Sequence, residues 1–174
     1  MAVIDGGIQY DHPDLAANMW TNEAEMNGTP GVDDDGNGYV DDIYGWNYYT
    51  DSGTITQHFH GTHVAGTVAA VNNNGIGVCG VAGGTGVGDG VRLMSCQNYD
   101  TDANGQEVGS VTEESFIYAA DNGAVIAQCS WGYNGIETPL SMQRAIQYLS
   151  GRPVRMKWGS DRTDEGRCGL LFGW

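Results

Sequence analysis

Short apolar runs alternate with longer segments of mixed polarity along this chain. The apolar runs at residues 2–5, 91–96 and 124–130 predict buried strands. Residues 112–120 and 139–149 predict helices, because the first opens with threonine and early acids and the second has proline in its first turn. This β-α-β order predicts an α/β fold with a doubly wound parallel sheet and right-handed crossovers.

Two polar residues occupy positions where such a fold places its chemistry. Asp5 ends the first predicted strand and is followed by Gly6-Gly7, so it lies where open α/β sheets gather their sites. His60 precedes a run of small residues at positions 63–71, which predicts a helix that can pack closely against neighbouring backbone. A histidine at the start of such a helix is a candidate catalytic base.

These motifs resemble those of the subtilisin-like serine proteases, the subtilase family. Residues 2–8 with His12-Pro13-Asp14-Leu15 are similar to the aspartate block of that family, and residues 60–67 are similar to its histidine block. Residues 73–82 resemble the loop after its histidine helix. Four ordered blocks, with Ser130-Trp131-Gly132 as the last, extend the resemblance over roughly the first 150 residues.

The resemblance implies a subtilisin-like serine endopeptidase with a polypeptide substrate. In that family Asp5 would orient the imidazole, and His60 would act as general base and then as general acid. Ser130, Trp131 and Gly132 would line the substrate cleft. The sequence contains no Gly-Thr-Ser-Met-Ala nucleophile block and no Ala-Gly-Asn oxyanion segment. We therefore expect a truncated fold with two triad members and no activity of the chain alone.

An acidic loop between the two blocks has the spacing of a calcium-binding loop. Oxygen-bearing residues and a glycine occupy its positions one, three, five, six and nine, as Asp33, Asp35, Asn37, Gly38 and Asp41. The twelfth position is Tyr44 instead of glutamate, and Asp42 is a candidate replacement. This pattern favours structural calcium, the alternative being a solvated acidic loop.

The resemblance implies a second calcium site as well. It would combine Asp14 with the loop of residues 71–78, which includes Asn73. No organic cofactor is expected.

Charge limits the range of partners. The formal net charge of −15 disfavours nucleic acid and anionic lipid surfaces. No apolar run is long enough to span a bilayer, and we expect no signal peptide before the first strand. A secreted or cell-envelope location is implied only by the resemblance, and the oligomeric state stays open.

Composition changes abruptly near residue 150. Five of the seven basic residues lie between Arg152 and Arg167. One choice of synonymous codons for residues 160–174, with its first base removed, translates as Gln-Thr-Gly-Pro-Met-Lys-Gly-Gly-Val-Val-Phe-Phe-Ser-Ala-Gly, which resembles the subtilase strand before the oxyanion asparagine. We therefore interpret residues 1–150 as the N-terminal part of a subtilase catalytic domain and residues 151–174 as a frame-shifted tail.

Two other functions fit parts of the sequence. His58, His60 and His63 suggest a zinc-dependent hydrolase, although Thr62 occupies the place of the aspartate in that motif. A calcium-stabilised module that binds peptides without cleaving them is the other alternative.

Overall fold

A parallel sheet forms the centre of the molecule. The computed structural model describes residues 1–132 and 138–151. The strands follow the order β2-β3-β1-β5, all parallel, with β1 between β3 and β5. A further strand, β4, pairs antiparallel with β3. The bounds of the strands are β1 Ala2–Gly6, β2 Gly45–Asn47, β3 Met94–Thr101, β4 Glu107–Gly109 and β5 Ala127–Gln128.

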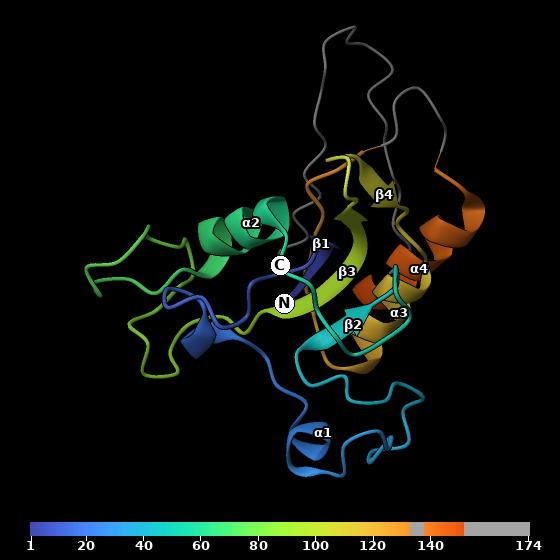
Figure 1. The fold of residues 1–174 in the computed structure, drawn as a ribbon, viewed down its shortest axis with the longest axis horizontal. Helices are drawn as coiled ribbons and strands as arrows, with labels where there is room; N and C mark the ends of the chain where they lie inside the picture. The colour runs from blue at the N-terminus through green and yellow to red at the C-terminus, as the bar shows by residue number, and fades with distance from the viewer. Residues whose placement is uncertain (133–137, 152–174) are drawn as a thin grey trace, which may run out of the picture.

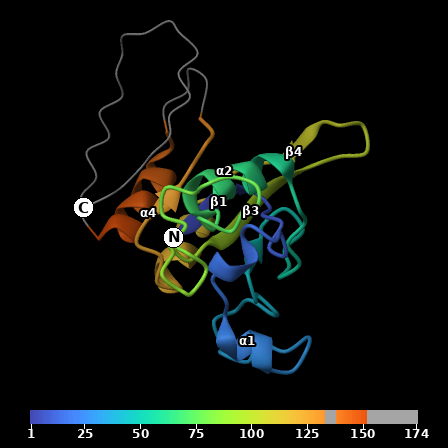
Figure 2. The same cartoon turned by 90° about the vertical axis from the view of Figure 1, so that its left-hand side faces the viewer.

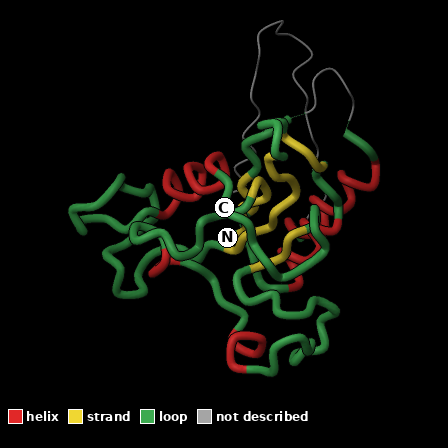
Figure 3. The backbone as a smooth tube through the Cα atoms, viewed as in Figure 1, coloured by secondary structure: helices red, strands yellow, loops and turns green. Residues whose placement is uncertain are grey.

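Helices cover both faces of this sheet (Figures 1 and 2). The helix α2 (Phe59–Ala69) lies on one face, and α3 (Glu114–Asp121) packs with α4 (Leu140–Ser150) on the other. A short α1 (Glu23–Asn27) and a 3-10 turn (Ala16–Asn18) precede β2. The predicted α/β fold with a doubly wound parallel sheet is confirmed. Figure 3 shows that long loops connect many of these elements.

The buried strand β1 separates two apolar cores. Val3 packs with Ala65 and Ala69 of α2, whereas Ile4 belongs to the core that contains Phe116 of α3. Successive side chains of a strand point to opposite faces, so a strand covered on both sides has no polar face. This explains why β1 is apolar up to its carboxyl end.

Close packing joins the first turn of α2 to the end of β1. A Cβ atom on Gly61 would lie 2.1 Å from the carbonyl oxygen of Gly6. Only glycine permits this approach of two backbones, so Gly61 fixes where the helix begins relative to the strand. This contact also places the neighbouring His60 beside the end of β1.

The strand boundaries differ from those expected. The strand predicted for 91–96 begins at Met94 and continues to Thr101, because hydrogen bonds satisfy buried polar residues beyond Cys96. The strand predicted for 124–130 is limited to Ala127–Gln128. Val125 is 69% exposed, so the apolar run there does not form one buried strand. The short strands β2 and β4 were not predicted.

Helix starts differ too. Glu113, not Thr112, is the N-cap of α3, and the buried Thr112 hydroxyl has no partner among the described residues. Pro139 stands immediately before α4 instead of within its first turn. No helix in the described parts of the chain has the length and apolar character needed to cross a membrane.

Candidate active site

The structure brings Asp5 and His60 together at the carboxyl edge of the sheet. Nδ1 of His60 donates a hydrogen bond of 2.7 Å to Oδ1 of Asp5, across 55 residues of sequence. The carboxylate is fully buried, while the imidazole is 32% exposed. A buried carboxylate bonded to Nδ1 holds the ring in one orientation and stabilises a positive charge on it.

One oxygen of Asp5 accepts all of its observed hydrogen bonds. Besides His60, the backbone N–H of Gly6 donates to Oδ1 over 2.7 Å and the hydroxyl of Tyr99 donates over 2.6 Å. The other oxygen, Oδ2, is buried and has no partner among the described residues. Tyr99 was not expected from the sequence, because no motif or periodicity distinguishes it from the rest of its strand.

Ser130, Trp131 and Gly132 follow β5 along the same edge. Because Ala2 pairs with Ala127 in the parallel register, this segment continues beside the end of β1. The indole N–H of Trp131 donates to the carbonyl of Ile4 over 2.6 Å, and Ser130 Oγ accepts from Gln128 over 2.9 Å. Gly132 is exposed. The structure therefore places all three residues beside the Asp5 end of the sheet.

The three histidines of the zinc hypothesis do not form a cluster. His58 is 3% exposed, and its Nε2 hydrogen-bonds with Thr101 Oγ1 at 3.0 Å. His60 bonds to Asp5, and His63 is exposed. Within residues 1–132 and 138–151, the one group of three possible ligand side chains close enough for a metal ion contains no histidine. This arrangement gives the zinc alternative no support.

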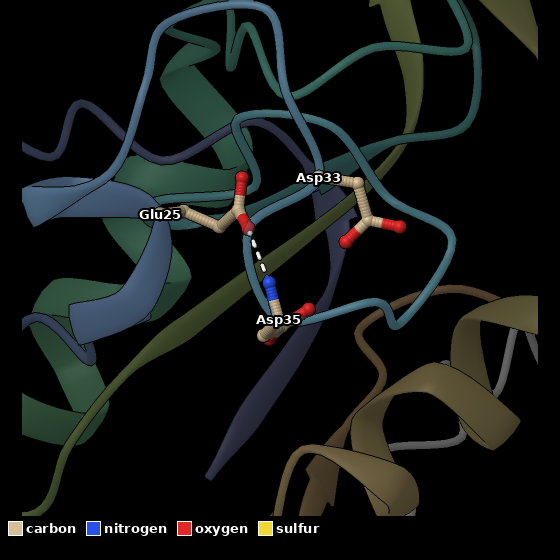
Figure 4. Close-up of side chains that lie close together, drawn as sticks. All are labelled: Glu25, Asp33 and Asp35. Carbon is tan, nitrogen blue, oxygen red and sulfur yellow. Dashed lines mark hydrogen bonds between the residues drawn. The ribbon is translucent and has the colours of Figure 1, made fainter.

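Three carboxylates come together at the acidic loop: Glu25, Asp33 and Asp35 (Figure 4). Each offers an oxygen atom, and these atoms lie within 4.8 Å of one another. Glu25 is buried in α1, and its Oε1 accepts from the backbone N–H of Asp35 over 3.2 Å. The loop spacing predicted Asp33 and Asp35. It missed Glu25, because Glu25 lies on α1 and precedes the loop.

The other predicted loop ligands have separate contacts. Asn37 donates from Nδ2 to Asp35 and Asp42, and Asp41 accepts from the backbone of Gly31. Asp42 is fully buried and also accepts from Tyr118 Oη over 2.7 Å. Burial raises the pKa of Asp42, an effect that these hydrogen bonds oppose. Asp42 therefore joins the loop to α3, whereas Glu25 supplies the third clustered carboxylate.

The second predicted metal site combines Asp14 with the loop of residues 71–78. Asp14 is buried and accepts from the side chain of Asn74 over 2.6 Å and from the backbone of Val78 over 3.0 Å. Asn73 is exposed and has a positive φ of 62°. Asp14 therefore contacts the neighbouring Asn74 in this loop, and Asn73 as a calcium ligand stays a prediction.

A cavity of about 580 Å³ opens beside α2. His12, His63 and Cys79 are among the residues that line it, but neither Asp5 nor His60 does. This cavity, a type of feature that often marks a binding site, therefore does not coincide with the Asp5–His60 pair.

The model of the subtilase family matches residues 1–161. The chain is 48% identical over 101 residues to Subtilisin-like protease 1 of Plasmodium vivax, which is 58% of this chain and 15% of that protein. It is 32% identical over 148 residues to the Thermophilic serine proteinase of Bacillus sp. (strain AK1), which is 85% of this chain and 29% of that protein.

A solved structure, the nisin leader peptidase NisP from Lactococcus lactis, matches with a TM-score of 0.39 and 20% identity, over 86% of this chain and 40% of that chain. The matched regions thus span only 15% and 29% of the two curated relatives.

Proposed function

Because the chain belongs to the subtilase family, we propose that it carries the aspartate and histidine of a serine endopeptidase triad. The observation that supports this most is the 2.7 Å contact between Asp5 and His60 at the carboxyl end of β1. The substrate would be a polypeptide, and the activity would belong to a longer protein that also contains the nucleophile.

The roles follow from the chemistry of the pair. His60 takes the proton of a serine hydroxyl as that oxygen attacks the peptide carbonyl, and then gives it to the leaving amine. Asp5 holds the imidazole by Nδ1 and stabilises its protonated form. Ser130, Trp131 and Gly132 form one wall of the substrate cleft. Without the serine and the oxyanion donor, the present sequence does not cleave peptides.

We assign residues 1–150 to the catalytic domain and residues 151–174 to a frame-shifted tail. Apart from Gly151, this tail lies outside the described residues. The concentration of basic residues after Gly151 supports the assignment. The family match includes residues 151–161 and leaves out residues 162–174. Sequencing the gene around codon 150 and beyond tests it, and a continuous frame that never encodes Gly-Thr-Ser-Met-Ala would contradict it.

The proposed activity is tested by expressing the chain beside a version whose frame is restored from the genomic sequence. We expect cleavage of casein and fluorophosphonate labelling of the restored protein alone. His60→Ala should abolish both, and His63→Ala, which changes an exposed histidine of the same helix, should preserve them. Labelling of the present chain above its His60→Ala control would overturn the proposal.

We also propose that the acidic loop binds calcium. Ligand oxygens at about 2.3–2.6 Å from one ion lie less than about 5 Å apart, and the clustered oxygens of Glu25, Asp33 and Asp35 meet that condition. No lysine or arginine forms a salt bridge with them within the described residues. The ion would neutralise this negative charge and tie α1 to the loop. Asp14 remains a candidate ligand of a second site, with Asn74 beside it.

Family membership is also the ground for proposing that the protein acts outside the cell or in the cell envelope. Detection of the protein in the culture medium or envelope fraction would test this, and its retention in the cytoplasm would contradict it.

A further inference from the structure

We propose that Tyr99 is a positioning residue for the Asp5–His60 pair, and that it weakens the bond of Asp5 to His60 by donating to the same carboxylate oxygen. This inference rests on the proposed function for its relevance to catalysis. Its geometry is independent of that function. Tyr99 Oη lies 2.6 Å from Asp5 Oδ1 and 3.2 Å from His60 Nδ1.

An irregularity in β3 brings Tyr99 to this position. Asp5 pairs with Gln97, but Gly6 pairs with Tyr99, so Asn98 is an extra residue on β3. A β-bulge of this kind changes where the following side chain points. Asn98 is itself fixed, since its Nδ2 donates to the carbonyl of Cys96 and its Oδ1 accepts from the backbone of Thr112. The bulge therefore holds Tyr99 beside the end of β1.

The hydroxyl of Tyr99 is a donor in this contact. Burial, and after it the hydrogen bond and negative charge of Asp5, raise the pKa of Tyr99 far above its ordinary value. The phenol consequently keeps its proton, and its single O–H points to the ionised carboxylate. The 3.2 Å separation from His60 Nδ1 is the weaker contact, because the shorter bonds to the carboxylate are assisted by its charge.

Other titratable groups surround the pair. The ring of His58 lies edge-on to Tyr99 at 5.3 Å between centroids. Glu107 on β4 acts on Tyr99 through its charge, Asp100 is adjacent to Tyr99 on β3, and His63 follows His60 by one turn of α2. Within the described residues, only Asp5 and Tyr99 make side-chain hydrogen bonds to the His60 imidazole.

Two consequences follow from three donors on one oxygen. Tyr99 and the Gly6 backbone hold the carboxylate in place, so that Oδ1 faces His60. At the same time, the proton of Tyr99 draws electron density from Oδ1 and reduces the attraction of that oxygen for the Nδ1–H of His60. Removing only the hydroxyl should therefore strengthen the bond from His60 to Asp5.

Tyr99→Phe tests this in the present chain, with Tyr48→Phe as the matched control. Tyr48 is another partly buried tyrosine, and its hydroxyl donates to the Glu114 carbonyl over 3.3 Å. Proton NMR at acidic pH observes the Nδ1–H of His60, assigned by its loss in His60→Ala. We expect this resonance to move downfield in Tyr99→Phe and to stay in place in Tyr48→Phe. An unchanged or upfield position in folded Tyr99→Phe would overturn the inference.

Asp5→Asn provides a second route if Tyr99→Phe fails to fold. Without the carboxylate charge, the pKa of Tyr99 should fall toward its ordinary value, as followed by NMR of tyrosine-labelled protein. An unchanged pKa of Tyr99 would refute the contact. In the protein with its reading frame restored, Tyr99→Phe should shift the acid limb of the pH profile of kcat/KM to higher pH and leave KM unchanged. Inactivity of that protein together with the NMR shift would reject the proposed function and retain the role of Tyr99.

Discussion

The two acidic centres of this molecule are constructed differently. At the sheet edge, the single carboxylate of Asp5 is buried at the end of β1 and meets one ionisable partner from α2. At the loop, Glu25, Asp33 and Asp35 gather with no basic side chain paired to them in the described structure. Figure 1 shows α1 and its loop at one extremity of the molecule, away from α2.

The difference lies in what fixes each carboxylate. The sheet and the close contact at Gly61 position Asp5 and His60, so their geometry follows from the core. The loop is held by backbone N–H groups that donate to its own side chains, such as those of Asn37 and Gly38 to Asp33. Such a loop lacks a core of its own. A cation that neutralises it should therefore stabilise the fold, while the Asp5–His60 pair needs no ion.

The largest effect that should distinguish the two centres is the response to calcium. Saturating the loop at a hundredfold excess over the dissociation constant should raise the free energy of unfolding by about 2.7 kcal/mol. Glu25→Gln should remove most of this gain, because it deletes the only buried carboxylate of the cluster. Thermal unfolding with calcium and with chelator measures it.

Glu23→Gln is the matched control, since Glu23 is an exposed acid of the same short helix. It should keep the full calcium response. The Nδ1–H resonance of His60 should not change with calcium in any of these proteins. If chelation leaves the midpoint of the wild-type chain unchanged and no metal copurifies, the acidic loop is merely solvated.

The next effect concerns the link between the loop and the core. Tyr118 is buried in α3, and its hydroxyl donates to the buried Asp42 over 2.7 Å. Tyr118→Phe should lower the free energy of unfolding by about 1.5–3 kcal/mol, as expected for a hydrogen bond to a charged group. Tyr48→Phe should cost less, about 0.5–1.5 kcal/mol, because the partners of its hydroxyl, the Glu114 backbone carbonyl and the Tyr39 hydroxyl, are both neutral. Urea unfolding of both variants gives the comparison, and equal losses would contradict the charged bond.

The sequence predicted the sheet edge better than it predicted the loop, for a physical reason. Asp5 and His60 each stand at the end of an element whose apolar pattern is visible in the chain, so their meeting follows from the fold. Glu25 and Tyr99 carry no such pattern. The first joins the loop from a separate helix, and the second depends on the single extra residue Asn98 in β3.

Local polar contacts account for other features that the sequence did not predict. The hydrogen bond of Asn74 to Asp14, next to a left-handed backbone at Asn73, is one such contact. The continuation of β3 past Cys96 is polar and buried, which an apolar pattern does not reveal. In each case the deciding feature is a side-chain hydrogen bond or a turn conformation, and neither changes the hydrophobic period.

The smallest expected effect is a dependence of the free energy of unfolding on pH that comes from Asp42 in the acidic loop. Burial raises the pKa of Asp42 above its ordinary value of 3.8. At a pH between the pKa of Asp42 in the unfolded chain and its higher pKa in the folded chain, Asp42 holds a proton in the folded chain that it has lost in the unfolded chain. The contribution of this group to stability is therefore fully present below the unfolded pKa and is lost as pH rises through the folded one.

Asp42→Asn should remove this dependence in the metal-free chain. As pH rises from about 4, the free energy of unfolding of Asp42→Asn should increase relative to that of the wild type. The increase should be about 1.4 kcal/mol for each unit by which burial has raised the pKa of Asp42. Asp41→Asn deletes an equal charge from a half-buried neighbour, and asparagine accepts the positive φ of 55° at that position. Urea unfolding of the three proteins across this pH range gives the slopes. If Asp42→Asn and wild type keep parallel slopes, the buried carboxylate is ionised throughout the range, and the hydrogen bonds from Asn22, Asn37 and Tyr118 outweigh its burial.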